Sequence, residues 1–448
     1  MASTISKSFL DSLWEFAAQD FPSEIKEEAK CCVADYISCA MIGAAQMKES
    51  DGAYLELALS PGNCPLIGLD KKSDMLSAAL LNGIHAHYIE LDDGHRFGML
   101  HPGVPVISAL LSVAAERGLS SEAFLRGLIV GYEATIRLAM AIQPGHKLKG
   151  FHATATCGTM GAALGLASAL SIGREKWNTV LSCAATDASG LLQLIDDSSE
   201  LKPYNAGRAA ACAINAAFYG STGVPGPEDV LGGKRGFFAV TAGELNEERL
   251  LNGFMPQYAI RTIYRKPYAA CRHTHAVVEA VLRLREEHGL KAEDAERIRI
   301  RTYGLAIRGH EHTEIRGEAS AKMSMPYSAA AALKYGRVNF QQYSPECLAD
   351  DELKRLMERV EIAEDPELSA LVPEKRAAVV TIESGTESFS CRVDYPKGEP
   401  ENPVSAEELK DKFFSLTEAA GIDEKRRSSI YDAVMKLEEG TDTLFSLL

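Results

Sequence analysis

Hydrophobic residues in the first half of the chain recur at three- and four-residue intervals. This spacing is typical of helices with one buried face. Three glycines, Gly158, Gly161 and Gly165, lie among alanines in one such stretch, which indicates a helix that neighbouring backbones approach closely. A dinucleotide-binding fingerprint is the competing interpretation, but no strand precedes these glycines. Helical spacing is found in 5–20, 24–43, 75–90, 103–117, 121–142, 157–171, 174–189 and 206–220.

The pattern changes to alternation after residue 265. Arg297–Thr302 alternates polar and apolar residues strictly, as a half-buried strand does. Residues 377–382 and 388–395 also have strand character, and Ser384-Gly385-Thr386 between them predicts a hairpin turn. Helical patterns lie among these strands at 274–288, 326–335 and 351–360.

Helical spacing returns near the C-terminus. After Pro403, Ser405 and Glu408 have the spacing of a capping box, which marks a helix start. A chain of 448 residues is long enough for two domains. The predicted fold is therefore mostly α with an α+β second domain. Residues 1–265 and 404–448 form the all-helical domain, and residues 266–403 form the inserted α+β domain.

Composition narrows the class of protein. With 46% hydrophobic and 24% charged residues, the chain resembles ordinary soluble proteins. Its net charge of -15 argues against nucleic acid as a partner, because phosphate binding needs clustered Lys and Arg. The most apolar run, Val104–Ala115, is too short to span a membrane. Ten scattered cysteines without a CxxC pair, and no secretory signal pattern, predict reduced thiols and a cytoplasmic location.

The eleven histidines are unevenly distributed, and several lie close to carboxylates. This mixture suggests either a metal site or acid–base catalysis. Histidines that cap helices or are satisfied in the core are a third possibility. The first two histidines of the cluster are two positions apart and so face different sides of a helix, and no HExxH is present, which argues against a metal. The cluster contains His85, His87, Glu90, Asp92, Asp93, His95 and His101.

Two of the histidines precede predicted helix starts. Pro102-Gly103 can begin a helix and leave His101 near its positive end. His152 lies in a glycine-containing loop, with Thr154 after it, before the small-residue helix. Helix N-termini attract anions, so both places suit a substrate carboxylate.

Basic residues mark two further candidate sites. Lys202 precedes Pro203 and is therefore expected to be extended, with its amine aimed inward; a surface lysine is the alternative. Lys266-Pro267-Tyr268 and the segment Cys271–His275 lie at the predicted domain boundary, where clefts commonly form. Cys271 shows no partner base, so a buried thiol is favoured over a nucleophile. A GxSxG elbow and a phosphate-binding loop are both missing.

Taken together, these segments resemble the MmgE/PrpD family of enzymes, which act on small polycarboxylic acids as dehydratases, decarboxylases or epimerases. The likeness covers nearly the whole chain, and the ordered set is far more specific than any one piece. A weaker match covers Ser324–Gly336, with Tyr327 at a helix start. The stronger matches are Asn82-Gly83, His87, Leu91-Asp92-Asp93, His101-Pro102-Gly103, Gly150-Phe151-His152 with Thr154, Lys202-Pro203 with Gly207 and Ala209-Ala210, and Lys266 to His275.

The resemblance implies a large all-helical domain with a smaller α+β lid, assembled as a homodimer, and a reaction without metal or organic cofactor. It also implies the site residues. The catalytic set is His101, His152, Lys202, Asp92 and Asp93. The substrate-binding set is Lys266, Cys271, Arg272, His275, Thr154 and Tyr327.

These residue types suit removal of a proton next to a carboxylate, which places a second negative charge on that carboxylate. We expect Lys202 and Arg272 to bind substrate carboxylates and stabilise this charge. His101 and His152 then transfer protons. Asp92 or Asp93 orients one of the histidines; the sequence leaves open which.

The predicted function is therefore a lyase, specifically a dehydratase of a small di- or tricarboxylate similar to 2-methylcitrate. An epimerase or isomerase of a dicarboxylate and a decarboxylase of a cis-aconitate-like acid are alternatives within the family. The chain departs from the decarboxylase branch at Gly94 and Cys271, and from the epimerase branch at Lys147. A non-catalytic carboxylate-binding protein and a metal-dependent hydrolase are the alternatives from other classes.

Overall fold

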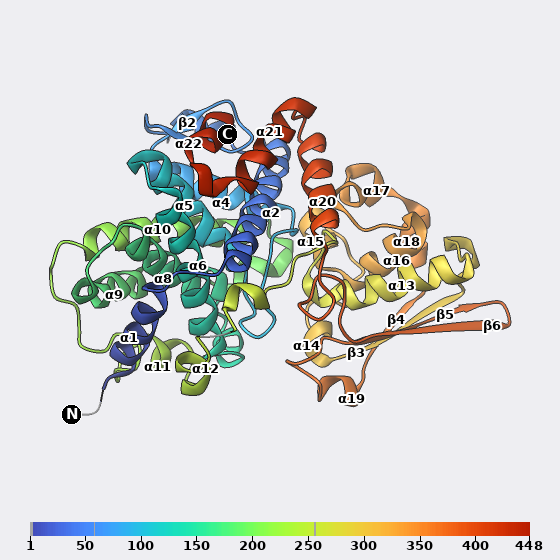
Figure 1. Cartoon of the computed structure of the whole chain (residues 1–448). Coiled ribbons are helices and arrows are strands. Elements are labelled where there is room, and N and C mark those ends of the chain that lie inside the picture. The colour runs from blue at the N-terminus through green and yellow to red at the C-terminus, as the bar shows by residue number, and fades with distance from the viewer. Residues whose placement is uncertain (1–2, 58, 255–256) are drawn as a thin grey trace. The chain divides into compact units, whose positions relative to one another are not determined.

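The computed structural model describes residues 3–57, 59–254 and 257–448, and it divides into two compact units (Figure 1). Unit 1 comprises Met1–Gln193, Leu201–Ile263 and Ser405–Leu448. Unit 2 comprises Leu194–Glu200 and Tyr264–Val404. Unit 1 is helical and unit 2 combines helices with a sheet, which confirms the predicted fold class. The division into separately folding domains stays a prediction.

Unit 1 contains all eight helices expected in the first half of the chain, with some ends displaced. Two helices begin earlier than their apolar spacing suggests, at Ala153 and at Lys202, because small and polar residues occupy their first turns. A short hairpin of β1 (Cys64–Pro65) and β2 (Lys72–Ser73) accompanies them. The helices are α1 (Ile5–Ala17), α2 (Ser23–Met47), α3 (Gly52–Leu57), α4 (Met75–Tyr88), α5 (Gly103–Arg117), α6 (Ser121–Met140), α7 (Gly145–Leu148), α8 (Ala153–Ala169), α9 (Trp177–Asp187), α10 (Lys202–Gly220), α11 (Phe237–Thr241), α12 (Glu247–Leu251), α20 (Ala406–Ala419), α21 (Glu424–Met435) and α22 (Asp442–Leu447).

Glycines allow the central helices to pack closely. Helices α5 and α10 each contact α4, α8 and one another, and α8 is buried along its whole length. A Cβ on Gly83 of α4 would lie 2.6 Å from the Cα of Gly207 in α10. A Cβ on Gly161 of α8 would lie 1.9 Å from the Thr135 hydroxyl in α6. The prediction of close backbone approach along α8 is thus confirmed.

The C-terminal helices return to the beginning of the chain. Helices α20 and α21 pack against α2, as the red and blue ribbons of Figure 1 show. The predicted capping box is confirmed: Ser405 Oγ accepts from the Glu408 amide at 3.1 Å, and the Ser405 amide donates to the Glu408 carboxylate at 2.7 Å. The structure's described helices include none that is both long and apolar enough to cross a membrane.

Unit 2 is built on a four-stranded sheet with the order β4-β3-β5-β6. Strand β3 pairs in parallel with β4 and antiparallel with β5, and β5 forms an antiparallel hairpin with β6. Helix α13 packs against β5 and β6 (Figure 1). The elements are α13 (His275–His288), β3 (Arg297–Thr302), α14 (Gly304–Ile307), α15 (Glu318–Met323), α16 (Met325–Tyr335), α17 (Pro345–Ala349), α18 (Asp351–Met357), β4 (Val360–Glu364), α19 (Pro366–Ser369), β5 (Ala378–Ser384) and β6 (Glu387–Val393).

The strict alternation of β3 and the β5–β6 hairpin are confirmed. Gly385 in the turn has a φ of 58°, a left-handed conformation that glycine adopts without strain. Strand β4 was not predicted, because the expected helix was extended to residue 360, whereas α18 ends at Met357. β4 is an edge strand in which no residue is fully buried, so it lacks the contrast of buried and exposed positions that identifies β3.

Candidate active site

Three histidines and a lysine, side chains that can bind or release protons, lie at helix ends within unit 1. His87 is in the last turn of α4, and His101 lies two residues before α5. His152 is the N-cap residue of α8, and Lys202 is the first residue of α10. All four residues are buried. Because the four helices pack together, their ends bring these residues into one region although the residues are far apart in sequence.

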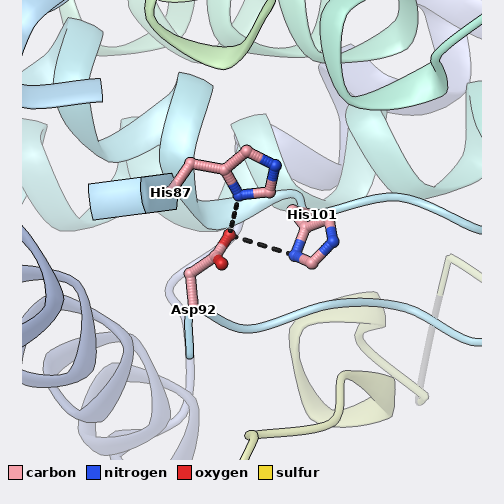
Figure 2. Close-up of side chains that lie close together, drawn as sticks. All are labelled: His87, Asp92 and His101. Carbon is pink, nitrogen blue, oxygen red and sulfur yellow. Dashed lines mark hydrogen bonds and ion pairs between the residues drawn. The ribbon is translucent and has the colours of Figure 1, made fainter. Parts of the chain in front are cut away.

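His87, Asp92 and His101 form a hydrogen-bonded cluster, shown in Figure 2. Asp92 Oδ2 lies 2.8 Å from His87 Nδ1 and 3.0 Å from His101 Nδ1. An ionised carboxylate only accepts hydrogen bonds, so both Nδ1 atoms carry the proton. The Nε2 atoms are therefore the ends of these rings that can gain or lose a proton. Among the described residues, His87 Nε2 and Asp92 Oδ1 have no hydrogen-bond partner.

The two adjacent aspartates have opposite environments. Burial alone would raise the pKa of Asp92, but the charges and hydrogen bonds of His101 and His87 outweigh it and hold that pKa well below its usual range. Burial raises the pKa of Asp93 to about 7, although Tyr132 donates a hydrogen bond to its carboxyl at 2.6 Å. Gly103 is required here, since a Cβ would lie 2.8 Å from the Asp93 carboxylate oxygens.

The two aspartates differ in how they contact the imidazoles. The Asp92 side chain contacts both imidazoles, whereas Asp93 reaches His101 only through its main-chain carbonyl, 2.7 Å from Nδ1. That carbonyl is a second acceptor for the same proton and fixes the ring further. Of the two carboxylates, that of Asp92 is the one in position to orient the rings, and its role stays a prediction.

His152 lies beside this cluster, with its ring centroid 6.3 Å from that of His87. Burial, then the positive charge of Lys202, lowers its pKa well below the usual range, so the ring is neutral. Asn205 Nδ2 lies 3.3 Å from His152 Nδ1 and donates to it, which leaves the ring proton on Nε2. Thr154, at the start of α8, accepts from the His101 amide at 3.1 Å and ties the two histidine segments together.

Lys202 forms an ion pair with Glu90. Its exposed fraction is 9%, so the alternative of a surface lysine is wrong. The expectation that Pro203 makes Lys202 extended is also wrong. Lys202 begins α10 and Pro203 is the second residue of the helix, where the missing amide hydrogen of proline is not needed. Glu90 has a φ of 57°, a left-handed conformation that costs energy for a residue other than glycine.

The same residues also satisfy the spacing of a metal site. One ligand atom from each of His87, Asp92 and His101 lies within 4.8 Å of the others. However, the separations of 2.8 and 3.0 Å are those of hydrogen bonds, and both Nδ1 protons would have to leave before a metal could bind there. The donor set thus fits a hydrogen-bonded acid–base cluster better, and the absence of a metal or cofactor stays a prediction.

Unit 2 contains a separate buried network around Arg272. Its guanidinium donates to Glu399 through Nε and Nη2, to His275 Nδ1 and the Lys397 carbonyl through Nη1, and to the Pro396 carbonyl through Nη2. All five N–H groups are used. His275 uses its other nitrogen on the Ala270 carbonyl at 3.1 Å. The expectation that Arg272 binds a substrate carboxylate is therefore not supported, since this arrangement leaves it no donor to offer.

The remaining predicted substrate-binding residues are also in unit 2. Lys266 and Tyr327 are buried, and the Tyr327 hydroxyl donates to the Gln342 carbonyl. Cys271 is half-buried, and its Sγ lies 3.6 Å from His310 Nε2, a partner base that the sequence did not reveal. Their role in binding stays a prediction.

Sequence reasoning did not assign a role to Tyr132 or Asn205. Tyr132 lies in the apolar spacing of α6, where nothing distinguishes it from a core aromatic residue. Asn205 follows Lys202 by three positions, so both belong to the first turn of α10, and correct placement of that helix start would have pointed to it.

A buried cluster of imidazoles and carboxylates at converging helix ends defines a site for acid–base chemistry on a small molecule. The chain belongs to the MmgE/PrpD family: the model of the MmgE/PrpD N-terminal domain matches residues 9–249, and that of the C-terminal domain matches residues 268–437.

Three relatives illustrate the range of the family. Cis-aconitate decarboxylase of Aspergillus terreus is 28% identical, over 95% of this chain and 91% of the relative. The cis-aconitate decarboxylase-like protein oryM of Aspergillus oryzae is 24% identical, over 96% and 93%. The mitochondrial 2-methylcitrate dehydratase of Yarrowia lipolytica is 24% identical, over 83% and 76%. Dehydratases and decarboxylases are both lyases, which confirms the predicted enzyme class.

Proposed function

We propose that this protein is a lyase that removes a proton next to a carboxylate of a small di- or tricarboxylic acid, and that it acts as a dehydratase of a 2-methylcitrate-like substrate. The observation that carries the proposal is the pair of imidazoles, His87 and His101, on ionised Asp92, with the His152 ring beside them and Lys202 at the start of a neighbouring helix. These residues offer a proton acceptor, a neutral hydrogen-bond donor and a cation.

The roles follow from the ring protons. His101 carries its Nδ1 proton toward Asp92 and the Asp93 carbonyl, so its neutral form takes the substrate proton at Nε2. Asp92 stabilises the resulting imidazolium. General base catalysis of this kind contributes about 10²–10⁴-fold.

His152 is the hydrogen-bond donor to the departing hydroxyl in this scheme. Its neutral ring offers the Nε2 hydrogen, since Asn205 occupies Nδ1. Dehydration takes one proton from carbon, and the His101 imidazolium passes that proton to the departing hydroxyl, so that water and a carbon–carbon double bond are formed and His101 is neutral again. Lys202 binds the carboxylate on which charge develops, after that carboxylate displaces Glu90.

A decarboxylase of a cis-aconitate-like acid is the second candidate. The 28% identity to the Aspergillus terreus decarboxylase over 95% of the chain favours it. Decarboxylation uses the same carbanion-like state, with carbon dioxide leaving and a proton added to carbon. The proposed homodimer and cytoplasmic location rest on the family resemblance and on the composition, and the small polycarboxylate is the proposed partner.

The test is turnover of citrate, 2-methylcitrate and cis-aconitate by the purified chain. Formation of alkene ultraviolet absorbance with release of water supports the dehydratase, and release of carbon dioxide supports the decarboxylase. His101→Gln is expected to abolish either activity, while His288→Gln, which removes an exposed unit 2 histidine stacked on Phe389, serves as control. Full activity in His101→Gln, or no turnover of any acid, contradicts the proposal.

A further inference from the structure

A lysine from the C-terminal helix α20 contacts the segment that carries Asp92. Lys412 Nζ donates to the Leu91 carbonyl oxygen at 2.6 Å, and the two residues are 321 positions apart in sequence. The same Nζ lies 2.6 Å from Asp35 Oδ1 on α2. The Lys412 side chain is 12% exposed and that of Asp35 is 2% exposed. All of these residues belong to unit 1.

The contact falls where the backbone needs support. The Leu91 carbonyl belongs to the peptide that joins Leu91 to Asp92, so its hydrogen bond fixes the orientation of the Asp92 backbone. One residue earlier, Glu90 has its left-handed φ of 57°. Strained backbone of this kind persists only where surrounding contacts hold it. The side chain of Asp92 is held by two imidazoles, and Lys412 holds the main chain next to it.

Lys412 remains charged despite its burial. Burial alone would lower its pKa, but the charge of Asp35, with smaller contributions that include Asp92, outweighs burial and raises it. The amine therefore stays an ammonium with donors for both Asp35 and the Leu91 carbonyl. A buried ion pair gives little net stability by itself, so a specific positional role is a natural explanation for it.

We propose that Lys412, held by Asp35, is a positioning residue that sets the Leu91–Asp92 peptide so that Asp92 aligns His87 and His101 for proton transfer. Lys412 touches neither imidazole; it acts through the backbone of Asp92. The inference rests on the proposed function, because it assigns a role in that reaction.

The chain supplies a matched control on α2, the helix that carries Asp35. Lys30 of α2 is also buried, and its Nζ donates to the Met435 carbonyl at 2.9 Å and to Glu27 and Glu438. Like Lys412, it joins α2 to a C-terminal segment, but it bonds none of the residues of the histidine cluster. Lys30→Met therefore measures how the loss of a buried lysine that joins two helical segments affects the fold, without a change at the histidines.

The test uses the double variant Lys412→Met/Asp35→Asn in the full chain. Replacing both partners avoids a buried unpaired carboxylate, so the protein keeps its fold while the bond to the Leu91 carbonyl is lost. We expect kcat to fall by about ten- to a hundredfold with KM changed less than about twofold, since misalignment acts on the proton transfer. Lys30→Met is expected to leave kcat unchanged. The single variant Lys412→Arg keeps the positive charge and the hydrogen-bond donors, so its kcat is expected to lie between those of the wild type and the double variant.

A second measurement tests the position of the Leu91–Asp92 peptide without needing turnover of a substrate. Amide hydrogen exchange of a peptide covering residues 89–101 is expected to accelerate about tenfold or more in the double variant and not in Lys30→Met, because local opening becomes easier. If the wild type turns over no acid, the proposed function fails and this exchange measurement alone decides the positioning role. Unchanged exchange, or a kcat equal to that of Lys30→Met, overturns the inference.

Discussion

The two units of this chain each contain a buried network of histidine and charged side chains, and the networks differ in how far their hydrogen-bonding capacity is used. In unit 2, Arg272 uses all five N–H groups and His275 uses both ring nitrogens. In unit 1, His87 Nε2 and Asp92 Oδ1 have no hydrogen-bond partner among the described residues. A saturated network holds a fold together, whereas buried polar atoms without partners are costly unless something else binds them.

This comparison separates two residues that looked equivalent in the sequence. Arg272 and Lys202 were both expected to bind substrate carboxylates. Lys202 has one carboxylate partner, Glu90, which an incoming carboxylate can replace. Arg272 would have to abandon Glu399 and main-chain carbonyls that fix the backbone of residues 396–397. The following variants test whether the residues of unit 1 take part in the reaction while the Arg272 network of unit 2 only stabilises the fold.

The largest effect is expected from Asp92→Asn. Both Nδ1 protons point at one oxygen of Asp92. The neutral amide carries no charge to stabilise an imidazolium, and its NH2 group cannot accept a hydrogen bond, so His101 and His87 are held less firmly. We expect kcat to fall by about 10³–10⁴-fold, the loss measured when the orienting aspartate of a catalytic triad is changed in this way. Steady-state kinetics on the substrate found by the turnover screen measures it.

The control for this variant is a second histidine–aspartate pair on the same helix. His85 Nε2 lies 2.6 Å from Asp51 Oδ2, and, among the described residues, this buried pair contacts none of His87, Asp92 and His101 through a hydrogen bond. Asp51→Asn is expected to leave kcat within about threefold, in line with the small differences expected for positions away from reacting atoms. Equal losses in the two variants would mean that burial of such a pair, and not its place in the cluster, determines the effect.

Arg272→Met tests the saturated network. Removing the cation leaves Glu399 buried without its partner, and we expect unfolding free energy to fall by about 3–5 kcal/mol. Because the guanidinium offers no donor to a substrate, KM should change less than about twofold for the protein that remains folded. Urea unfolding and kinetics measure the two effects. A KM raised tenfold or more with stability intact would return Arg272 to the substrate-binding set.

The pH dependence of stability sharpens the contrast between Asp92 and Asp93. Burial raises the pKa of Asp93 to about 7 from its ordinary 3.8, so between these values the folded state binds more protons than the unfolded state. Stability from this group is therefore lost as pH rises from 3.8 toward 7, by at most about 4 kcal/mol. Asp93→Asn mimics the protonated acid and should become progressively more stable than wild type over this range. A stability difference independent of pH in urea unfolding would contradict the raised pKa.

The features that could be predicted from the sequence are those that depend on residues close together in the chain. Helical periodicity and the alternation of β3 are local, so the fold class and most elements could be read from the sequence. His101 and His152 were placed correctly at helix starts, because Pro102-Gly103 and the small-residue helix are local signals too. The start of α10 was missed, since Lys202 and Pro203 carry no apolar spacing, and the backbone of Lys202 was wrongly expected to be extended, although the burial of its side chain was predicted.

The unpredicted part of the site depends on contacts between distant segments. Tyr132 reaches Asp93 across 39 positions, and Lys412 reaches Leu91 across 321. No periodicity links such pairs, so the choice between Asp92 and Asp93 needed the structure. Saturation of Arg272 is also invisible in the sequence, because three of its hydrogen bonds go to ring or main-chain atoms whose positions depend on the folded chain.

The smallest effect is expected from Glu90→Gln, which tests whether the Lys202 pair is exchangeable. If a substrate carboxylate must displace Glu90, removing the Glu90 charge weakens the competitor, and KM should fall by about three- to tenfold with kcat little changed. Glu90 favours and Lys202 opposes protonation of His152, so the variant lowers the pKa of a ring that is already neutral and leaves the neutral-pH rate unaffected. Lys202→Met, which removes the proposed ligand itself, should raise KM instead. An increase in KM for Glu90→Gln would mean that Glu90 orients Lys202 rather than competing with the substrate for it. The Lys202–Glu90 pair would then be a fixed part of the fold, as the Arg272 network is.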